Sequence, residues 1–268
     1  MRKVLIFVAS GFSTRMGGFP KGLALVNGKP VIANAIDCAI PYYDDIYVIC
    51  NFKTESHFQK VLLENGVKDV NLRPIITGKG DAESVLKSIM IVKNELKQNF
   101  DCTFCWGDAF FVSEQPFSCM IEAKLDSVTP ILVGCSVDMN PYAYFDVYTE
   151  NGDFSKAKIK KSYFKKKDGE VPVGIHDQCI FRCNADLFLE ALELYRNELG
   201  YNGNDYLKSP TNEMGLLHSF TYFDTIGKSA QITLIPEKQV FSFNTVEELN
   251  AIAETIDASK NKSGWMVY

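Results

Sequence analysis

Residues 7–32 read FVASGFSTRMGGFPKGLALVNGKPVI. This stretch begins inside a continuous apolar run, Val4–Val8, which predicts a buried β-strand. A loop that contains glycines, an arginine and a lysine follows this strand directly. Open α/β sheets bind their ligands in the loops at the carboxyl ends of the strands. The stretch therefore predicts a phosphate-binding loop after the first strand of an α/β sheet.

The loop carries the groups that a polyphosphate site needs. Arg15 offers a guanidinium fork that fits phosphate oxygens, and Lys21 offers a point charge. Gly11 lets backbone N–H groups approach a phosphate without a Cβ in the way, and Ser13 and Thr14 add hydroxyl donors. A purely structural turn would need glycine or asparagine but not two cations. Phosphate binding is thus the favoured interpretation.

Two familiar nucleotide motifs do not fit this loop. A dinucleotide site needs G-x-G-x-x-G, whereas the frame that starts at Gly11 lacks the second and third glycines. The string G-x-x-x-x-G-K-[ST] of a P-loop is also missing from the sequence. Asn51 follows the second predicted strand, where an oxidoreductase would place an acid for the ribose. A nicotinamide-dependent oxidoreductase is therefore disfavoured.

Apolar runs alternate with amphipathic segments through the first part of the chain, and this alternation is typical of a parallel sheet. The predicted strands are Val4–Val8, Ile46–Cys50, Asn71–Ile76 and Cys102–Trp106, and the predicted helices are Pro30–Ile40, His57–Asn65 and Ala82–Leu96. The predicted fold class is α/β, with a mostly parallel, Rossmann-like sheet flanked by helices.

The second half of the chain is richer in β-strands. Its predicted strands are Pro130–Val137, Ala143–Thr149, Ile175–Arg182 and Ile232–Pro236, and its predicted helices are Ala185–Leu199, Thr211–Phe223 and Val246–Ala258. Asn151-Gly152 predicts a hairpin turn. We expect a single domain over residues 1–258 with an inserted β-rich lobe at about 130–222, followed by a tail at 259–268.

Composition restricts the class of partner. The chain has 268 residues and a formal net charge of −5, which argues against nucleic acid or an anionic membrane as the main partner. No stretch reaches the length of a membrane span, and the short apolar run near the N-terminus is better interpreted as the first strand than as a signal peptide. The sequence does not indicate an oligomeric state.

The eight cysteines fall mostly inside apolar runs, as reduced core thiols of a cytoplasmic protein do. Cys102 and Cys105 have the spacing of half a zinc site, but no second CxxC or HxxxH pair matches them. With only three histidines in the chain, a histidine-based metal site is also disfavoured.

The loop resembles the signature of the nucleotidyltransferases of GT-A-like fold. The matching residues are G-x-S-T-R-M-G-G-x-P-K-x-L, followed by a short strand and G-K-P-V-I. Enzymes of this family transfer a nucleoside monophosphate from an NTP to a phosphorylated acceptor and release pyrophosphate. The resemblance implies nucleotide binding by residues Ala9, Ser10, Gly11, Ser13 and Thr14, and catalytic roles for Arg15 and Lys21.

Two further landmarks support this resemblance. The family has an apolar strand that ends in Gly-Asp, whose carboxylate holds Mg²⁺, and Cys102–Trp106 is followed by Gly107-Asp108. Its closing motif, [DN]-x-N-T-x-E-[DE]-L, resembles the segment from Phe243 to Leu249. The resemblance implies that Asp108 and Asn244 are the ligands of a Mg²⁺ cofactor. Thr245 and Glu248 have the capping-box spacing in any case.

The segment after the third strand, TGKGDAESV, bears on the base. Uridylyl and thymidylyl transferases of the family carry a Gln-x-x-Gly-Thr-x-x-Ala type of segment here, which this chain lacks. Gly78 and Gly80, followed by Ser84 on the next helix, are similar to the cytidylyltransferase branch. CTP is therefore favoured over UTP, and an ordinary strand-to-helix loop is the alternative interpretation of the two glycines.

The acceptor side is less defined. His176-Asp177-Gln178-Cys179 stands where sugar enzymes of the family have Asn-x-Gly, and Thr211-Asn212-Glu213 precedes a predicted helix. Asp177 and Glu213 are the candidate acceptor-binding residues. The lysine-rich segment 156–167 predicts a solvated hairpin edge; alternatively, Lys160 or Lys161 reaches the phosphates.

The combined hypothesis is a Mg²⁺-dependent nucleotidyltransferase that uses CTP and a phosphorylated small molecule, such as a precursor of surface polysaccharide. A UTP-dependent sugar-1-phosphate uridylyltransferase and a catalytically silent nucleotide-binding regulator are the alternatives.

Overall fold

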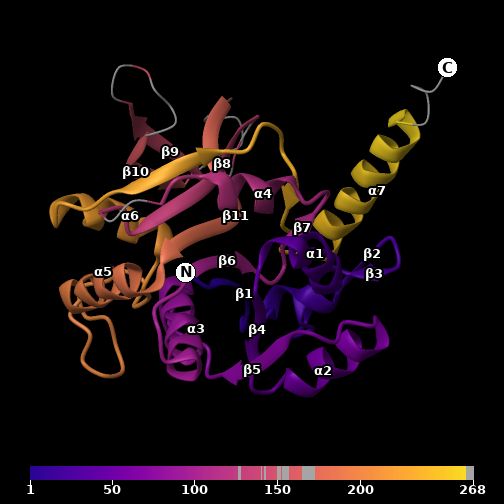
Figure 1. Ribbon diagram of the computed structural model, residues 1–268, viewed down its shortest axis with the longest axis horizontal. Helices are drawn as coiled ribbons and strands as arrows, with labels where there is room; N and C mark the ends of the chain where they lie inside the picture. Colours follow the sequence, from indigo (N-terminus) through magenta and orange to yellow (C-terminus); the bar gives the residue numbers. More distant parts are fainter. Residues whose placement is uncertain are drawn as a thin grey trace.

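The computed structural model describes residues 1–125, 128–139, 141, 143–149, 152, 157–164 and 173–263, without the side chains of residues 164 and 257–263. A nine-stranded sheet runs through the molecule in the order β5-β4-β1-β6-β11-β8-β12-β10-β9, with helices against it (Figure 1). This arrangement confirms the predicted α/β fold. Within the described residues, no helix combines the length and apolar character that a membrane crossing requires.

The first half of the chain forms the parallel part of the sheet. Neighbouring strands in the order β5-β4-β1-β6 are all parallel, and the central strand β1 is buried between them. The strands are β1 (Lys3–Ala9), β4 (Asp45–Asn51), β5 (Asn71–Ile75) and β6 (Asp101–Trp106). The helices that connect them are α1 (Val31–Ala39), α2 (Glu55–Glu64) and α3 (Asp81–Leu96). All seven elements were predicted from the sequence.

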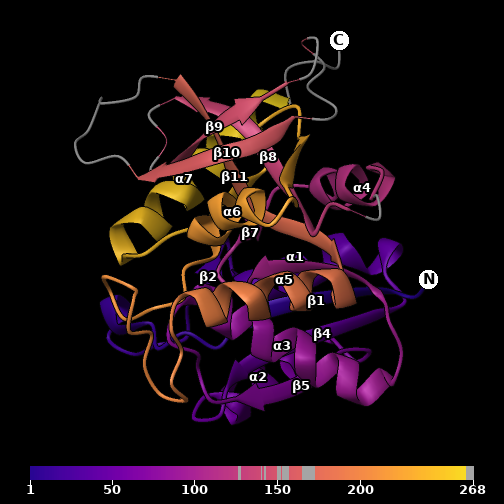
Figure 2. The ribbon, with the colours of Figure 1, turned by 90° about the vertical axis from the view of Figure 1, so that its left-hand side faces the viewer.

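The second half continues the same sheet with mixed pairing. Strand β11 lies antiparallel to both β6 and β8, β12 lies parallel to β8, and β9 and β10 form an antiparallel hairpin. The strands are β8 (Ile131–Met139), β9 (Ala143–Tyr148), β10 (Lys158–Phe164), β11 (Val173–Asn184) and β12 (Ala230–Leu234). The helices are α4 (Gln115–Glu122), α5 (Ala185–Glu198), α6 (Leu216–Thr225) and α7 (Val246–Ser263). Figure 2 places β9 and β10 at one end of the molecule and β5 and α2 at the other.

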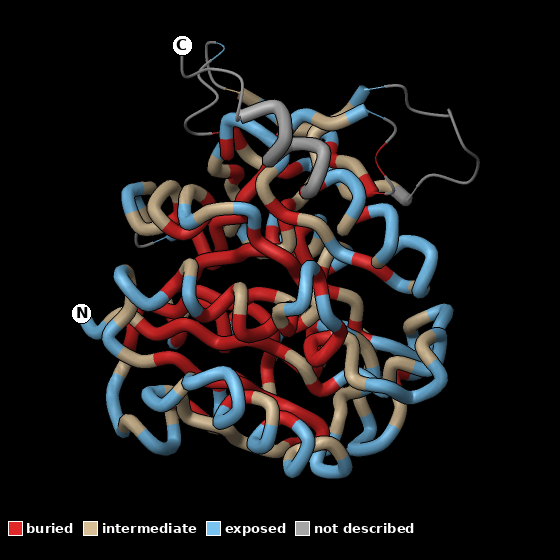
Figure 3. Tube along the Cα trace, turned by 90° about the vertical axis from the view of Figure 1, so that its right-hand side faces the viewer, coloured by how far each residue is buried: buried red, intermediate tan, exposed pale blue. Residues whose placement is uncertain are grey.

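Alternate residues of β1 pack against opposite layers of helices. Ile6 belongs to a core cluster with Ile89 of α3 and with residues of α5 and α6. Phe7 belongs to a second cluster with Ile36 of α1 and with residues of α2 and α4. The buried residues form a continuous band through the middle of the molecule (Figure 3). A parallel sheet covered on both faces explains why its strands are apolar without alternation.

Several short elements were not predicted. Helix α4 and the two-residue strands escape a pattern search because each has too few residues to show a period. The short strands pair as two small sheets, β2 (Leu25–Val26) with β3 (Lys29–Pro30) and β7 (Phe110–Phe111) with β13 (Val240–Phe241). The 3₁₀ helices are η1 (Thr14–Met16), η2 (Lys21–Leu23) and η3 (Ile40–Tyr42).

Two predicted helix boundaries were wrong. The helix predicted for Thr211–Phe223 begins at Leu216, because Asn212 has a positive φ of 55° and a carboxylate of α3, that of Asp81, accepts the Leu216 N–H. The last helix does not end at Ala258 but continues to Ser263. Asn151 of the predicted hairpin turn and the end of the predicted tail, 264–268, lie outside the described residues.

The cysteines are core thiols, as predicted. All eight are free, and five of them are buried: Cys50, Cys102, Cys105, Cys135 and Cys183. Burial raises the pKa of the Cys105 thiol well above its ordinary value, which keeps it protonated. The described residues contain no group of three or more His, Cys, Asp or Glu side chains that could hold a metal ion, so the zinc interpretation gains no support.

One buried arginine joins the two halves of the sheet. Arg182 of β11 donates from Nε and Nη2 to the two carboxylate oxygens of Asp101 on β6, at 2.8 and 2.6 Å. Its Nη1 donates to the carbonyl oxygens of Met120, Ile121 and Ala123 at the end of α4. Arg182 is only 7% exposed. A buried, fully bonded ion pair of this kind fixes the position of β11 against β6.

We expect Arg182→Met to lower the free energy of unfolding by about 3–5 kcal/mol, because it leaves the carboxylate of Asp101 buried without a cation. The measurement is urea denaturation followed by circular dichroism. Arg73→Met is the matched control, since the Arg73–Glu95 pair is partly exposed and is expected to contribute no more than about 1 kcal/mol. Equal losses in both variants would contradict the assigned role of Arg182.

Candidate nucleotide-binding site

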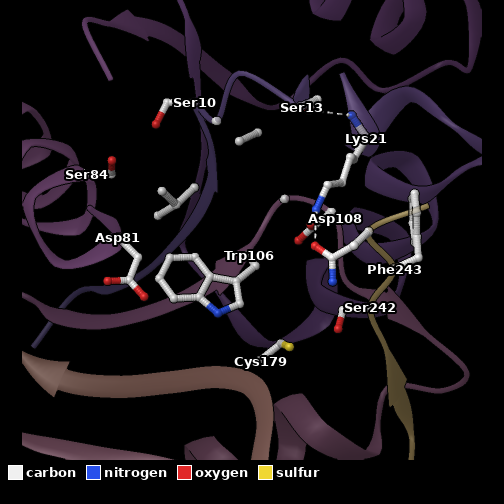
Figure 4. Close-up of a pocket in the computed structure, with 16 residues that line it drawn as sticks. Ser10, Ser13, Lys21, Asp81, Ser84, Trp106, Asp108, Cys179, Ser242 and Phe243 are labelled. Carbon is white, nitrogen blue, oxygen red and sulfur yellow. Dashed lines mark hydrogen bonds and ion pairs between the residues drawn. The ribbon is translucent and has the colours of Figure 1, made fainter. Parts of the chain in front are cut away.

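A cavity of about 490 Å³ lies where β1 and β6 end (Figure 4). Segments from five parts of the chain line it: the end of β1 with its loop, the start of α3, the end of β6, the middle of β11 and the segment before α7. The lining residues are Val8, Ala9, Ser10, Gly11, Ser13, Lys21, Gly22, Asp81, Ser84, Trp106, Gly107, Asp108, Cys179, Ser242, Phe243 and Asn244. The cavity is therefore at the carboxyl ends of parallel strands, where the sequence placed it.

Three predicted site residues meet at one point of the cavity wall. The Lys21 ammonium donates to Oδ2 of Asp108 at 2.7 Å and to Oδ1 of Asn244 at 3.1 Å. The three residues come from the first loop, the end of β6 and the segment before α7, and Figure 4 shows the side chain of Lys21 extending to Asp108. Folding thus brings the two predicted metal ligands and the predicted catalytic lysine together.

Two glycines allow this convergence. A Cβ on Gly22 would lie 2.5 Å from the carbonyl oxygen of Gly107, and a Cβ on Gly107 would collide with the side chain of Ala9. The loop after Lys21 therefore packs directly on the backbone next to Asp108. The sequence analysis named Gly107 only as part of the Gly-Asp landmark. The structure shows why a glycine is needed there: β1, β6 and the loop approach one another too closely for a Cβ at this position.

Hydrogen bonds fix the shape of the loop. Ser13 adopts a positive φ of 49°, and its Oγ accepts the Lys21 N–H at 3.3 Å. On the other side, the side chains of Asn51 and Thr77 both donate to the carbonyl oxygen of Ser10. Asn51 at the end of β4 is therefore a structural residue of this loop.

The segment before α7 holds Asn244 through the two residues of the predicted capping box. The backbone N–H of Glu248 donates to Oγ1 of Thr245 at 3.2 Å, and the Glu248 carboxylate accepts the N–H of Asn244. The bond to Thr245 confirms that this threonine caps the helix, whereas the Glu248 carboxylate reaches the residue before the cap and not the N–H of Thr245 itself. The two bonds also fix the backbone that presents the Asn244 amide to the cavity.

The oxygen donors at this point suit a magnesium ion. Asp108 and Asn244 already face a positive charge, the Lys21 ammonium, with one carboxylate and one amide oxygen. Mg²⁺ binds to few protein oxygens and completes its shell with water and substrate phosphates. The described residues contain no group of three acidic, histidine or cysteine side chains here, so two predicted ligands fit an ion that arrives with a triphosphate.

Other predicted residues lie away from the cavity wall. Arg15 and Thr14 are exposed on η1, and Glu213 is exposed on the turn before α6. Asp177 is partly buried beside Cys179, whose N–H it accepts at 3.1 Å. Burial raises the pKa of the Asp177 carboxyl. Their proposed contacts with substrates remain predictions.

In the predicted base-binding segment, the side chain of Ser84 forms hydrogen bonds within the segment itself. Ser84 lines the cavity, but its Oγ accepts the N–H of Gly78 and donates to the carbonyl oxygen of Gly80, both at 3.1 Å. Gly80 has a positive φ of 98° and packs on the backbone of Met214. The loop is thus held by its own serine and by the turn that precedes α6.

The predicted lysine hairpin is present in its described part. Lys160 pairs with Asp224 of α6 at 3.7 Å, and the Lys161 ammonium lies over the ring of Tyr163 at 4.8 Å. Neither is among the residues that line the cavity. Residues 156 and 165–167 of the segment lie outside the described residues.

Half of the sixteen cavity residues were not among the predicted site residues: Val8, Gly22, Asp81, Trp106, Gly107, Cys179, Ser242 and Phe243. Cys179 reaches the wall through a β-bulge of β11, where the register with β8 shifts and Cys179 adopts a positive φ of 55°. Burial raises its pKa well above the ordinary value, so the thiol stays neutral. A bulge has no reliable sequence pattern, whereas Trp106 directly precedes the Gly-Asp landmark and could have been found from it.

Comparison with known proteins agrees with this geometry. A family model described as MobA-like NTP transferase domain matches residues 5–145, more than half of the chain. The chain belongs to this family. The matched region contains the glycine-rich loop, Lys21 and Asp108. The predicted resemblance to nucleotidyltransferases is therefore confirmed for this MobA-like chain. A search of curated proteins found no match.

Solved structures of nucleotidyltransferases share the fold at 14% identity. The inositol-1-phosphate CTP transferase from T. maritima has a TM-score of 0.68, with 96% of this chain and 95% of that chain covered. A nucleoside-diphosphate-sugar pyrophosphorylase from Vibrio cholerae RC9 has a TM-score of 0.67, with 94% and 99% covered. HddC from Yersinia pseudotuberculosis, solved in complex with GMP-PN, has a TM-score of 0.65, with 95% and 99% covered. The similarity extends past the region matched by the family model.

We expect Gly22→Ala to destabilise the protein by about 1–3 kcal/mol, because the added methyl group would force the loop away from the Gly107 carbonyl. Gly11→Ala is the matched control in the same loop, since a Cβ there meets no atom within 4 Å, and we expect a change below about 0.5 kcal/mol. Thermal denaturation without nucleotide measures both. Identical melting curves for the two variants would show that the close approach is not a constraint.

Proposed function

We propose that this MobA-like protein is a Mg²⁺-dependent nucleotidyltransferase that transfers NMP, with CTP favoured as donor, to a phosphorylated small molecule and releases pyrophosphate. The observation that carries the proposal is the convergence of Lys21, Asp108 and Asn244 on the wall of the cavity beside the glycine-rich loop. One cation and two oxygen ligands at that point are suited to bind a metal–triphosphate complex.

The reaction is an in-line displacement at the α-phosphorus. An oxygen of the acceptor phosphate forms a bond to that phosphorus, while the bond to the bridging oxygen of the β-phosphate breaks and its electron pair leaves with pyrophosphate. The acceptor phosphate is already ionised, so no general base is needed. Catalysis is then mainly a matter of positioning and electrostatic stabilisation.

Each site residue has a defined task in this scheme. Asp108 and Asn244 would hold the magnesium ion, which supplies positive charge to the phosphate oxygens. Lys21, released from Asp108, would offset the negative charge that develops on the α-phosphate and the leaving group. The backbone from Ala9 to Thr14 would bind the nucleotide, and Arg15 would approach the phosphates from its exposed position on η1.

The acceptor would bind on the side of the cavity formed by the second half of the chain, the lobe at about 130–222. Asp177 lies next to Cys179 on the cavity wall, and Glu213 lies beside the loop of Gly80, so both remain candidates for contacts with the acceptor. Precursors of surface polysaccharide are the proposed acceptor class, and a cytoplasmic location follows from this role.

Two alternatives remain. A uridylyltransferase would use the same phosphate site with a different base, and the titles of the similar structures name both CTP transfer and sugar pyrophosphorylase chemistry. A silent regulator is less favoured, because Lys21 and Asp108 are both present and contact each other. Activity measurements on variants of these two residues separate the enzyme from the regulator.

We expect Lys21→Ala and Asp108→Ala each to lower turnover by at least ~10²-fold, the scale of one lost charge-stabilising group. The assay measures pyrophosphate release with an NTP, Mg²⁺ and a panel of phosphorylated acceptors. Lys60→Ala serves as control, because Lys60 is exposed on α2 and its contact with Glu64 lies on the same helix. Full activity in either site variant would refute the assignment.

A second prediction concerns the metal without nucleotide. The Lys21 ammonium occupies the oxygens that would bind the ion, so Lys21→Met should bind Mn²⁺ about tenfold more tightly than the natural protein, a difference of ~1.4 kcal/mol. Electron paramagnetic resonance of free Mn²⁺ gives this affinity directly. Lys29→Met, which removes an exposed lysine paired with Asp37, is the control. Weaker Mn²⁺ binding by Lys21→Met would place the metal elsewhere.

A further inference from the structure

The cavity has a second polar wall that the phosphate chemistry does not use. Asp81, at the first residue of α3, lies in this wall together with Ser10 at the end of β1. Figure 4 shows both on the opposite side of the cavity from Lys21 and Asp108, with the Trp106 ring between Asp81 and Asp108. The Asp81 carboxylate is not suited to bind the triphosphate, because both groups are negatively charged and repel each other.

One half of the Asp81 carboxylate has a structural role. Its Oδ1 accepts the N–H of Ala82 at 2.8 Å and the N–H of Leu216 at 2.7 Å. These groups are the first N–H donors of α3 and α6, so one oxygen joins the starts of two helices. Burial raises the pKa of the Asp81 carboxyl, and the two amide donors act against this rise. The carboxyl group is thus held in one orientation.

The other half has no such partner. Among the described residues, no hydrogen bond reaches Oδ2 of Asp81, although the residue belongs to the cavity wall. Ser10 is a second, independent observation: it is 1% exposed, it lines the cavity, and its Oγ is buried without a hydrogen-bond partner among the described residues. Buried polar atoms without partners are costly, and a ligand that bonds them removes this cost.

We propose that Oδ2 of Asp81 accepts a hydrogen bond from the exocyclic amino group of the nucleobase and so selects amino-bearing bases over uracil. The inference rests on the proposed function, because it assigns the base end of the same site. With the triphosphate held at Lys21, the base of the nucleotide extends toward the wall that holds Asp81 and Ser84. The Trp106 ring offers this planar base an apolar surface.

The chemistry of the base edges explains the selection. A carboxylate oxygen with a fixed orientation is an acceptor, and the amino group of cytosine or guanine is a donor. Uracil presents a carbonyl oxygen in place of the amino group, and that oxygen would face Oδ2 without a proton between them. A buried polar group that loses its partner discriminates strongly against such an analogue.

The variant Asp81→Asn tests this assignment with little disturbance of the fold. The amide oxygen of asparagine can still accept the Ala82 and Leu216 N–H groups, and those two donors keep the NH₂ group on the cavity side. Only the atom that faces the cavity changes, from acceptor to donor. Asp186→Asn is the matched control, because Asp186 is an exposed residue at the start of α5 that pairs with Lys93.

Calorimetry with Mg²⁺ measures the affinity of the protein for each of four nucleotides. They form two pairs, CTP with UTP and GTP with ITP, and only the first member of each pair carries the exocyclic amino group in question. We expect the natural protein to prefer the amino-bearing member of the pair that it binds by at least about tenfold, the scale of one hydrogen bond to a charged group. In Asp81→Asn we expect this ratio to fall at least tenfold, because the amino-bearing base loses its acceptor, and UTP, whose carbonyl oxygen can accept from the new NH₂ group, should also gain affinity. Asp186→Asn should keep the natural ratio.

The outcomes separate the two proposals. Binding of none of the four nucleotides by the natural protein would overturn the proposed function itself. Tight binding with ratios near one, or ratios unchanged in Asp81→Asn, would overturn only the role of Asp81. If Asp81→Asn changed only the KM for the acceptor, the role of Asp81 in base recognition would also be overturned, because the residue would then contact the acceptor. The natural ratios test the proposal even if Asp81→Asn does not fold.

Discussion

The buried pair of Arg182 and Asp101 is the constraint on which the rest of the structure depends. It attaches an antiparallel strand, β11, to the edge of a parallel sheet that would otherwise end at β6. The same arginine binds three carbonyl oxygens at the end of α4, so the helix, β6 and β11 have one common anchor. Because the bonds are charge-assisted and buried, a shift in register would leave several polar groups without partners.

This anchor also determines the shape of the cavity. Strand β6 begins at Asp101 and ends at Trp106, next to Gly107-Asp108, so the anchor and the end that lies at the cavity belong to the same strand. With the register of β11 fixed, its bulge places Cys179 on the cavity wall with Asp108. The loop from β1 then packs on Gly107 through Gly22. The site is therefore a consequence of strand pairing as much as of its own residues.

Much of this could be predicted because the relevant patterns are local. The parallel strands have continuous apolar runs, since both faces are covered, and the glycine-rich loop directly follows the first of them. Asp108 and Asn244 could be found from short motifs, although these motifs contain no information on the distance between the two residues. Hydrogen bonds to Lys21 now bring the two together across 136 residues of chain, from position 108 to position 244.

The rest depends on contacts between distant segments, which no local pattern contains. The start of α6 is set by Asp81, whose carboxylate lies 135 positions earlier in the chain. Cys179 enters the cavity through a bulge rather than through strand alternation. Arg15 shows the reverse case: its motif is clear, yet the structure places its side chain at the surface. Sequence motifs could thus identify the candidate residues, but they could not predict the orientation of the side chains.

The distribution of charge in the cavity gives the site its direction. Lys21 is partly neutralised by Asp108, so the proposed phosphate end would gain its full positive character only with a metal ion on that carboxylate. The opposite wall holds Asp81, a second carboxylate, which is unfavourable for phosphates and favourable for hydrogen-bond donors. A nucleotide that entered with its phosphates toward Asp81 would meet repulsion at one end and an unused cation at the other. One orientation of the nucleotide is therefore favoured before any contact with the acceptor is made.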